Sequence, residues 1–138
     1  RVLDLSVEYA KERVQFGRPI GAFQAIKHRC ADMLVDVEGM RSAVYHAAWA
    51  LGAGDPDRSV AASTAKTWCS DASRRVMASG LQVHGGIGNT WECMAHVHLR
   101  RAVLSSDLLG GAGASLDRVL AHHRISRSVD GGAPDGLR

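Results

Sequence analysis

The segment FQAIKHRCADMLVDVEGMRSAVYHAAWAL, residues 23–51, carries the strongest indication of the architecture. Its apolar side chains recur alternately four and three residues apart, at Ile26, Cys30, Met33, Val37, Met40, Val44, Ala47 and Leu51. That spacing places them along one side of an α-helix, whereas a strand would need alternation at every second residue. A stripe of this period seats a helix against its neighbours in a left-handed bundle. The stretch therefore predicts one long helix in an all-α fold.

Helical patterns continue on both sides of this helix, separated by corners rich in glycine and proline. Further helices are predicted over residues 2–13, from residue 57 or 58 to 83, from residue 90 or 91 to 105, and over 114–124. No internal repeat and no strand-like alternation interrupts them. We expect an up-and-down four-helix bundle, followed by a disordered tail. The expected bundle covers residues 1–125 and the tail covers residues 126–138.

Composition and charge restrict the function. The chain has 138 residues, enough for one domain, and a net charge of +3 from 17 basic and 14 acidic side chains. These charges are dispersed, which argues against a nucleic-acid-binding surface. No apolar run approaches the about 20 residues that span a bilayer, and no leader pattern opens the chain. Because the chain starts at Arg1 inside a helical pattern, we expect a fragment, a trimmed product or a split subunit.

Cysteines and histidines give no sign of a metal site. Cys30, Cys69 and Cys93 are far apart and lack CxxC spacing, which indicates reduced, packed thiols in a cytoplasmic protein. No two of the seven histidines stand four residues apart with a carboxylate beside them. We therefore expect no bound metal.

The segment ERVQFGRPIGAFQ, residues 12–24, is more polar than a connection between two packed helices requires. Arg13 offers five rigid donors, which suit a pyrophosphate. Gly17 and Pro19 interrupt the helix and let the backbone double back. We interpret this segment as a loop between two helices that contacts a ligand.

The second unusual segment is QVHGGIGNTWE, residues 82–92. Two adjacent glycines at a helix end allow left-handed backbone angles and the close approach of a ligand. A plain helix cap would explain an isolated glycine pair, but the additional Gly88 favours a binding surface.

Together, these segments and the helix order resemble the C-terminal helical domain of the acyl-CoA dehydrogenases, over about residues 1–113. The matching positions are Tyr9-Ala10-x-Glu12-Arg13-x-x-Phe16-Gly17-Arg18-Pro19-Ile20, Phe23-Gln24, Ala31-Asp32-Met33, Gln82-Val83-His84-Gly85-Gly86-x-Gly88, Glu92 and Arg100. The resemblance implies an FAD site at a subunit interface, with Arg13 reaching the pyrophosphate held by a neighbouring subunit. The further cofactor contacts that it implies are Phe16, Phe23, Gln24, Gln82, Val83, His84, Gly85 and Gly86.

One position departs from the family pattern. Family members usually carry a glutamate that removes the α-proton of the acyl-CoA, and ungapped counting from Gly85 places Leu109 there. Leucine cannot accept a proton, and losing a general base costs about 10²–10⁴-fold in rate. Asp107 is acidic, but its shorter side chain and shifted register make it a poor substitute. No catalytic residue is therefore assigned.

The resemblance implies the C-terminal domain of an FAD-dependent enzyme that converts an acyl-CoA to a trans-2-enoyl-CoA in fatty acid metabolism. A glutamate upstream of Arg1 could supply the missing base. Alternatively, the chain belongs to a non-catalytic partner subunit that completes the FAD site of a heteromer. A helical interaction module without a cofactor is a third reading. The implied partners are acyl-CoA, same-family subunits in a homo- or hetero-oligomer, and an electron-transferring flavoprotein.

Overall fold

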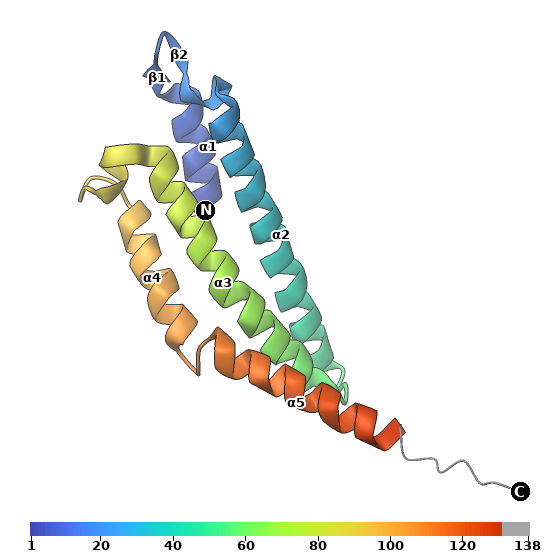
Figure 1. The fold of residues 1–138 in the computed structure, drawn as a ribbon. Coiled ribbons are helices and arrows are strands. Elements are labelled where there is room, and N and C mark those ends of the chain that lie inside the picture. Colours follow the sequence, from blue (N-terminus) through green and yellow to red (C-terminus); the bar gives the residue numbers. More distant parts are fainter. Residues whose placement is uncertain (131–138) are drawn as a thin grey trace, which may run out of the picture.

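The computed structural model describes the backbone of residues 1–130 and the side chains of residues 1–124. Within residues 1–130 it contains five α-helices: α1 (Val2–Glu12), α2 (Gln24–Gly52), α3 (Arg58–His84), α4 (Ala95–Asp107) and α5 (Ala112–Asp130). Two 3₁₀ segments, η1 (Ile20–Ala22) and η2 (Gly85–Asn89), and a small hairpin complete the chain. The predicted all-α bundle is confirmed (Figure 1).

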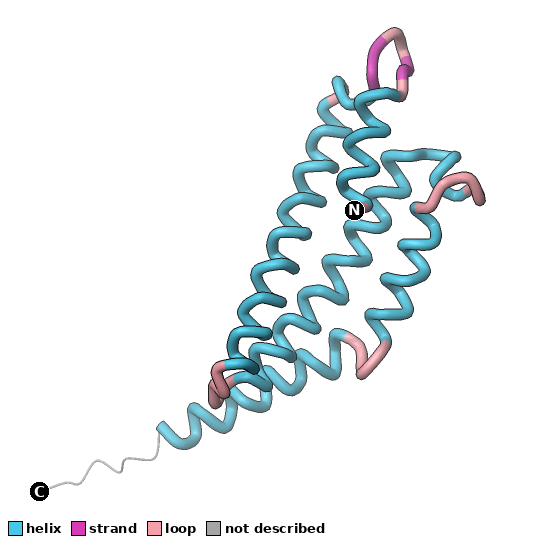
Figure 2. The backbone as a smooth tube through the Cα atoms, turned by 180° about the vertical axis from the view of Figure 1, so that it is seen from behind, coloured by secondary structure: helices cyan, strands magenta, loops and turns pink. Residues whose placement is uncertain are grey.

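Helix α3 is the centre of the bundle, since it packs against α1, α2, α4 and α5. Figure 1 shows α2, α3 and α4 running back and forth, with α1 beside α2 at one end and α5 crossing the other end. Viewed from behind, the hairpin and the loop that precedes α4 lie at the same end of the bundle (Figure 2). This end gathers the two segments that the sequence singled out.

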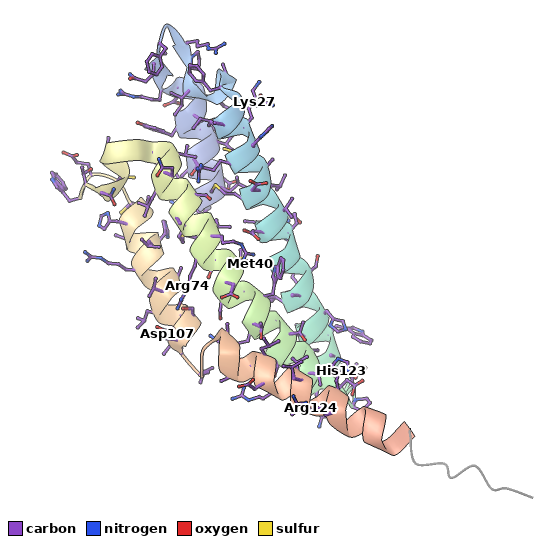
Figure 3. The ribbon with its side chains drawn as sticks, viewed as in Figure 1. Lys27, Met40, Arg74, Asp107, His123 and Arg124 are labelled. Atoms are coloured by element: carbon purple, nitrogen blue, oxygen red, sulfur yellow. The ribbon has the colours of Figure 1, made fainter. Side chains whose placement is uncertain are left out.

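Small residues allow these helices to approach closely. One core cluster consists of alanines from α2 and α3, namely Ala47, Ala50, Ala61 and Ala65. A second joins Val2, Met33 and Val76 from three helices, and Met40 packs on its edge, between α2 and α3 (Figure 3). The closest approach is at Gly80, where an added Cβ would lie 2.5 Å from a methyl carbon of Val2. Gly80 therefore fixes how tightly α1 packs on α3.

The inward face of α2 differs from the predicted stripe in its second half. Ala47 is buried as the stripe predicts, but Val44 and Leu51 are exposed, and Ala50, which lies off the stripe, is buried. At this end of α2 the inward face is instead formed by Ala47 and Ala50, which pack against Ala61 and Ala65 of α3.

A polar contact also links α2 and α3. The Arg75 guanidinium donates to both carboxylate oxygens of Asp36, with nitrogen–oxygen distances of 3.0 and 2.6 Å. The same guanidinium lies 5.5 Å from the ring centre of Trp68, which sits directly over Gly39 of α2. The carboxylate raises the pKa of Arg75 by accepting its hydrogen bonds. Arg75 therefore serves the α2–α3 contact.

The prediction of no strands is wrong at one place. β1 (Val14–Gln15) pairs antiparallel with β2 (Arg18–Pro19). The turn residues Phe16 and Gly17 have φ angles of 53° and 76°, the pattern of the two-residue turn that matches hairpin twist. Strands of two residues are too short to produce a visible alternation in sequence, but the expected reversal of the chain is present.

Some helix boundaries also differ from the expected ones. α4 begins at Ala95, later than residue 90 or 91, because the chain first forms η2 and a turn. α5 continues to Asp130, beyond the expected end at residue 124, so residues 126–130 of the expected tail are helical. The remainder of that tail, residues 131–138, lies outside the described residues.

Substituting Gly80→Ala should lower the free energy of unfolding by roughly 1–2 kcal/mol, because overpacking at Val2 outweighs the higher helix propensity of alanine. Urea unfolding followed by circular dichroism measures this change. Gly113→Ala is the matched control, since a Cβ there meets no atom within 4 Å. Equal stabilities for the two variants would contradict the proposed closeness of α1 and α3.

Substituting Gly17→Ala should open the hairpin, because a left-handed alanine costs roughly 1–2 kcal/mol. The readout is hydrogen exchange of the Ile20 amide, which donates to the Arg13 carbonyl at 2.8 Å. We expect exchange to become about tenfold faster, the equivalent of 1.4 kcal/mol. Phe16→Asn should not accelerate exchange, since asparagine tolerates positive φ; acceleration there would disprove the turn assignment.

Candidate functional site

The C-terminal end of α1 and the C-terminal end of α3 meet through two aromatic rings. Tyr9 stacks on His84, with ring centres 4.7 Å apart and ring planes inclined by 24°. The Nδ1 atom of His84 lies 2.8 Å from the Gly80 carbonyl oxygen, so Nδ1 must carry the proton and donate it. These contacts bring residues 12–24 and 82–86 to one end of the bundle (Figure 1).

Arg13 lies at the junction of α1 and the hairpin and is exposed. Its amide donates to the Tyr9 carbonyl at 2.9 Å, and its own carbonyl accepts from Ile20 at 2.8 Å. The backbone is thus held on both sides. Among the described residues, no carboxylate pairs with the guanidinium, so its donors are available to an anion.

Aromatic and cationic side chains surround the hairpin. Phe16, at its tip, is 91% exposed and meets Phe23 edge-on, with ring centres 6.0 Å apart. Arg18 covers the other ring, its guanidinium carbon 4.2 Å from the Phe23 centre. Gln24 contacts His28 one turn along α2, at 3.3 Å between side-chain nitrogens. Sequence reasoning did not include Arg18 among the site residues, although its place beside Gly17 in the hairpin could have suggested it.

The glycine ridge, Gly85 and Gly86, is open. Gly85 has a φ of 64° and ends α3, and an added Cβ at either glycine meets no atom within 4 Å. A ligand can therefore approach the backbone closely. Gln82 is exposed, whereas Val83 is only 3% exposed and packs in the core. Any ligand contact of Val83 would have to come from its backbone.

A cleft of about 700 Å³ opens next to this end, between α1, η2 and α4. Its lining is mainly apolar and includes Val2, Leu5, Ile87 and Met94, together with several acidic and basic side chains. Of the predicted cofactor residues, only His84 lines it. The cleft and the expected cofactor surface are thus neighbouring but separate features.

Leu109 and Asp107 lie at the opposite end of α4. Leu109 is 93% exposed with a φ of 62°, so a non-acidic side chain occupies an exposed, left-handed position. The Asp107 carboxylate accepts from Arg74 Nη2 at 2.9 Å, and Figure 3 shows the two residues facing each other between α3 and α4. This ion pair directs Asp107 toward α3.

The cysteines and histidines have structural surroundings. Cys30, Cys69 and Cys93 are free and half-buried, and burial raises the pKa of the Cys30 and Cys69 thiols. His96 Nδ1 bonds the Cys93 carbonyl, and His122 lies 3.2 Å from Asp57. Within the described part of the chain, no three potential metal ligands gather. None of the described helices has the length and apolar character needed to cross a bilayer.

Comparison with known proteins identifies the family. The sequence matches the family described as "Acyl-CoA dehydrogenase, C-terminal domain" over residues 1–129. It is 49% identical to acyl-CoA dehydrogenase IpdE2 of Mycobacterium tuberculosis over 109 residues, 79% of this chain and 32% of that protein.

Two solved structures carry the same fold. A Tcur3481-Tcur3483 steroid ACAD variant superimposes with a TM-score of 0.87 at 35% identity, covering 92% of this chain and 35% of that one. The ChsE4-ChsE5 complex from M. tuberculosis gives a TM-score of 0.77 at 37% identity, covering 96% and 34%. The chain thus spans about a third of each of these proteins. It belongs to the acyl-CoA dehydrogenase family, as its C-terminal helical domain.

Proposed function

We propose that this chain is the C-terminal domain of an FAD-dependent acyl-CoA dehydrogenase and that it binds the pyrophosphate of an FAD shared with a neighbouring subunit. The observation that carries the proposal is the exposed Arg13 guanidinium, without a carboxylate partner among the described residues, at the same end as the open glycine ridge. A cation next to bare backbone suits a dianionic pyrophosphate.

The residues present fit such a cofactor. Arg13 would bind the phosphates through charge-assisted hydrogen bonds, and Gly85 and Gly86 would let them approach the peptide backbone. Phe16 and Phe23 offer apolar surface, and Gln24 offers an amide. When bound, FAD accepts the hydride in the dehydrogenation of an acyl-CoA to a trans-2-enoyl-CoA.

A second candidate function is favoured by Leu109. A side chain without a proton-accepting atom stands at the expected position of the base, and Asp107 is engaged by Arg74. We infer that the chain can belong to a partner subunit that completes a neighbour's FAD site without its own catalysis. The likeness to the ChsE4-ChsE5 complex supports a heteromer. Otherwise, a glutamate elsewhere in the intact protein supplies the base.

Three further elements belong to the proposal. The acyl-CoA is the substrate of the intact assembly, and an electron-transferring flavoprotein is its electron acceptor, both by analogy with the family. The three free cysteines suit a reducing compartment, so we place the protein in the cytoplasm. Same-family subunits complete the oligomer.

Substituting Arg13→Ala in the intact protein should weaken FAD binding by about 10–100-fold, because charge-assisted hydrogen bonds contribute roughly 1.5–3 kcal/mol. Flavin absorbance per mole of purified protein, before and after dilution, measures the loss. Arg13→Lys should retain part of the binding, since it keeps the charge but not the planar fork.

Arg41→Ala is the matched control for Arg13→Ala. Arg41 is also an exposed arginine, but it lies within α2 and pairs with Glu38 three residues away. Its loss should leave the flavin content unchanged. If the Arg13→Ala protein keeps its full flavin content before and after dilution, the assignment of the pyrophosphate site is refuted.

The subunit composition distinguishes the two candidate functions. Native mass spectrometry of the intact protein, purified from its own host, should detect an unlike same-family subunit if the second candidate is correct. A homo-oligomer that dehydrogenates acyl-CoA by itself would exclude that candidate and imply a base elsewhere in the same chain.

A further inference from the structure

The turn between α4 and α5, residues 108–111, is attached to α3 on both sides. Before the turn, Lys66 Nζ donates to the Ser105 carbonyl at 2.8 Å. After it, the Thr67 hydroxyl, which donates to the Ser63 carbonyl of its own helix at 2.9 Å, also lies 3.4 Å from the Ala112 carbonyl oxygen. The contact before the turn is therefore a full hydrogen bond, and the contact after it is a weaker, shared one.

Arg74, two turns further along α3, makes the most extensive of these contacts. Its Nε and Nη2 atoms donate to the Ser106 hydroxyl oxygen at 3.0 and 2.6 Å, and Nη2 also donates to Asp107 at 2.9 Å. Ser106 is only 3% exposed, and its hydroxyl donates to the Val103 carbonyl at 2.6 Å. We call Arg74, Ser106 and Asp107 the Arg74 network.

The conformation of the turn is unfavourable by itself. Leu109 adopts a left-handed backbone angle, which a side-chain-bearing residue rarely adopts, and Gly110 follows with a φ of 91°. Leu109 is also almost fully exposed, so burial among the described residues does not offset this cost. The contacts that remain to hold the turn are those with α3 and the helix-end hydrogen bonds of α4 and α5.

We propose that Arg74 is a positioning residue that fixes the α4–α5 turn through Ser106 and Asp107, and thereby fixes the place and direction of Leu109. That Leu109 stands at a catalytic position rests on the proposed function. The positioning itself rests on the contacts between α3 and α4 and can be tested separately. In the intact protein, Arg74 thus sets the surface that the turn presents to its surroundings.

Hydrogen exchange of the intact protein tests the proposal. Arg74→Met should make the peptide that covers residues 104–114 exchange about tenfold faster, because two charge-assisted contacts to the buried Ser106 are lost. Arg74→Lys should restore part of the protection. Arg75→Met is the matched control: it breaks the pair with Asp36 on α2 and should leave this peptide unchanged.

The double variant separates a shared network from general destabilisation. If Arg74 acts through Ser106, then Arg74→Met with Ser106→Ala should accelerate exchange no more than the stronger single variant. Three results would overturn the proposal. The accelerations of exchange in the two single variants could multiply in the double variant, or Arg74→Met and Arg75→Met could accelerate exchange equally. The third is fast exchange of the turn peptide already in the unaltered protein. Flavin content is measured in parallel: it should be unchanged in Arg74→Met, so a failure of the FAD assignment is recognised separately.

Discussion

The close contact between α1 and α3 at Gly80 is the constraint on which the candidate site depends. No side chain larger than hydrogen fits there without displacing Val2, and His84, one turn later, bonds the Gly80 carbonyl while it stacks on Tyr9. These contacts fix the end of α1 against the end of α3. Arg13 and the glycine ridge are consequently held at the same end of the bundle, although about seventy residues separate them in sequence.

Two groups of residues with different chemical character lie at different positions along α3. At its C-terminal end lie an exposed cation, aromatic rings and open backbone, which suit an anionic dinucleotide. Further back, Arg74 holds a turn that carries Leu109 where a proton acceptor would be expected. Under the proposed function, this chain would supply groups that bind the cofactor, and the proton acceptor would come from a longer chain or from a partner.

Periodicity and turn residues predicted the helices, because an apolar stripe and helix-breaking glycines are local signals. The two-residue strands had no local signal, since they are defined by pairing across Phe16 and Gly17. The burial of Ala50 in place of Leu51 depends on packing against Ala61 and Ala65 of α3, which the pattern of α2 alone does not contain. The Arg74 network joins residues more than thirty positions apart, so only the packing of α4 on α3 reveals it. The roles of the cofactor residues remain predictions.

The central position of α3 also affects how the domain unfolds. Its neighbours α4 and α5 pack mainly against it, so a segment lacking α3 would retain little of its interior. Melting should consequently be a single cooperative event, with few partially folded species and no stable half-domain after proteolytic cleavage within α3. Loss of order in this one helix would release the cationic hairpin and the α4–α5 turn at the same time.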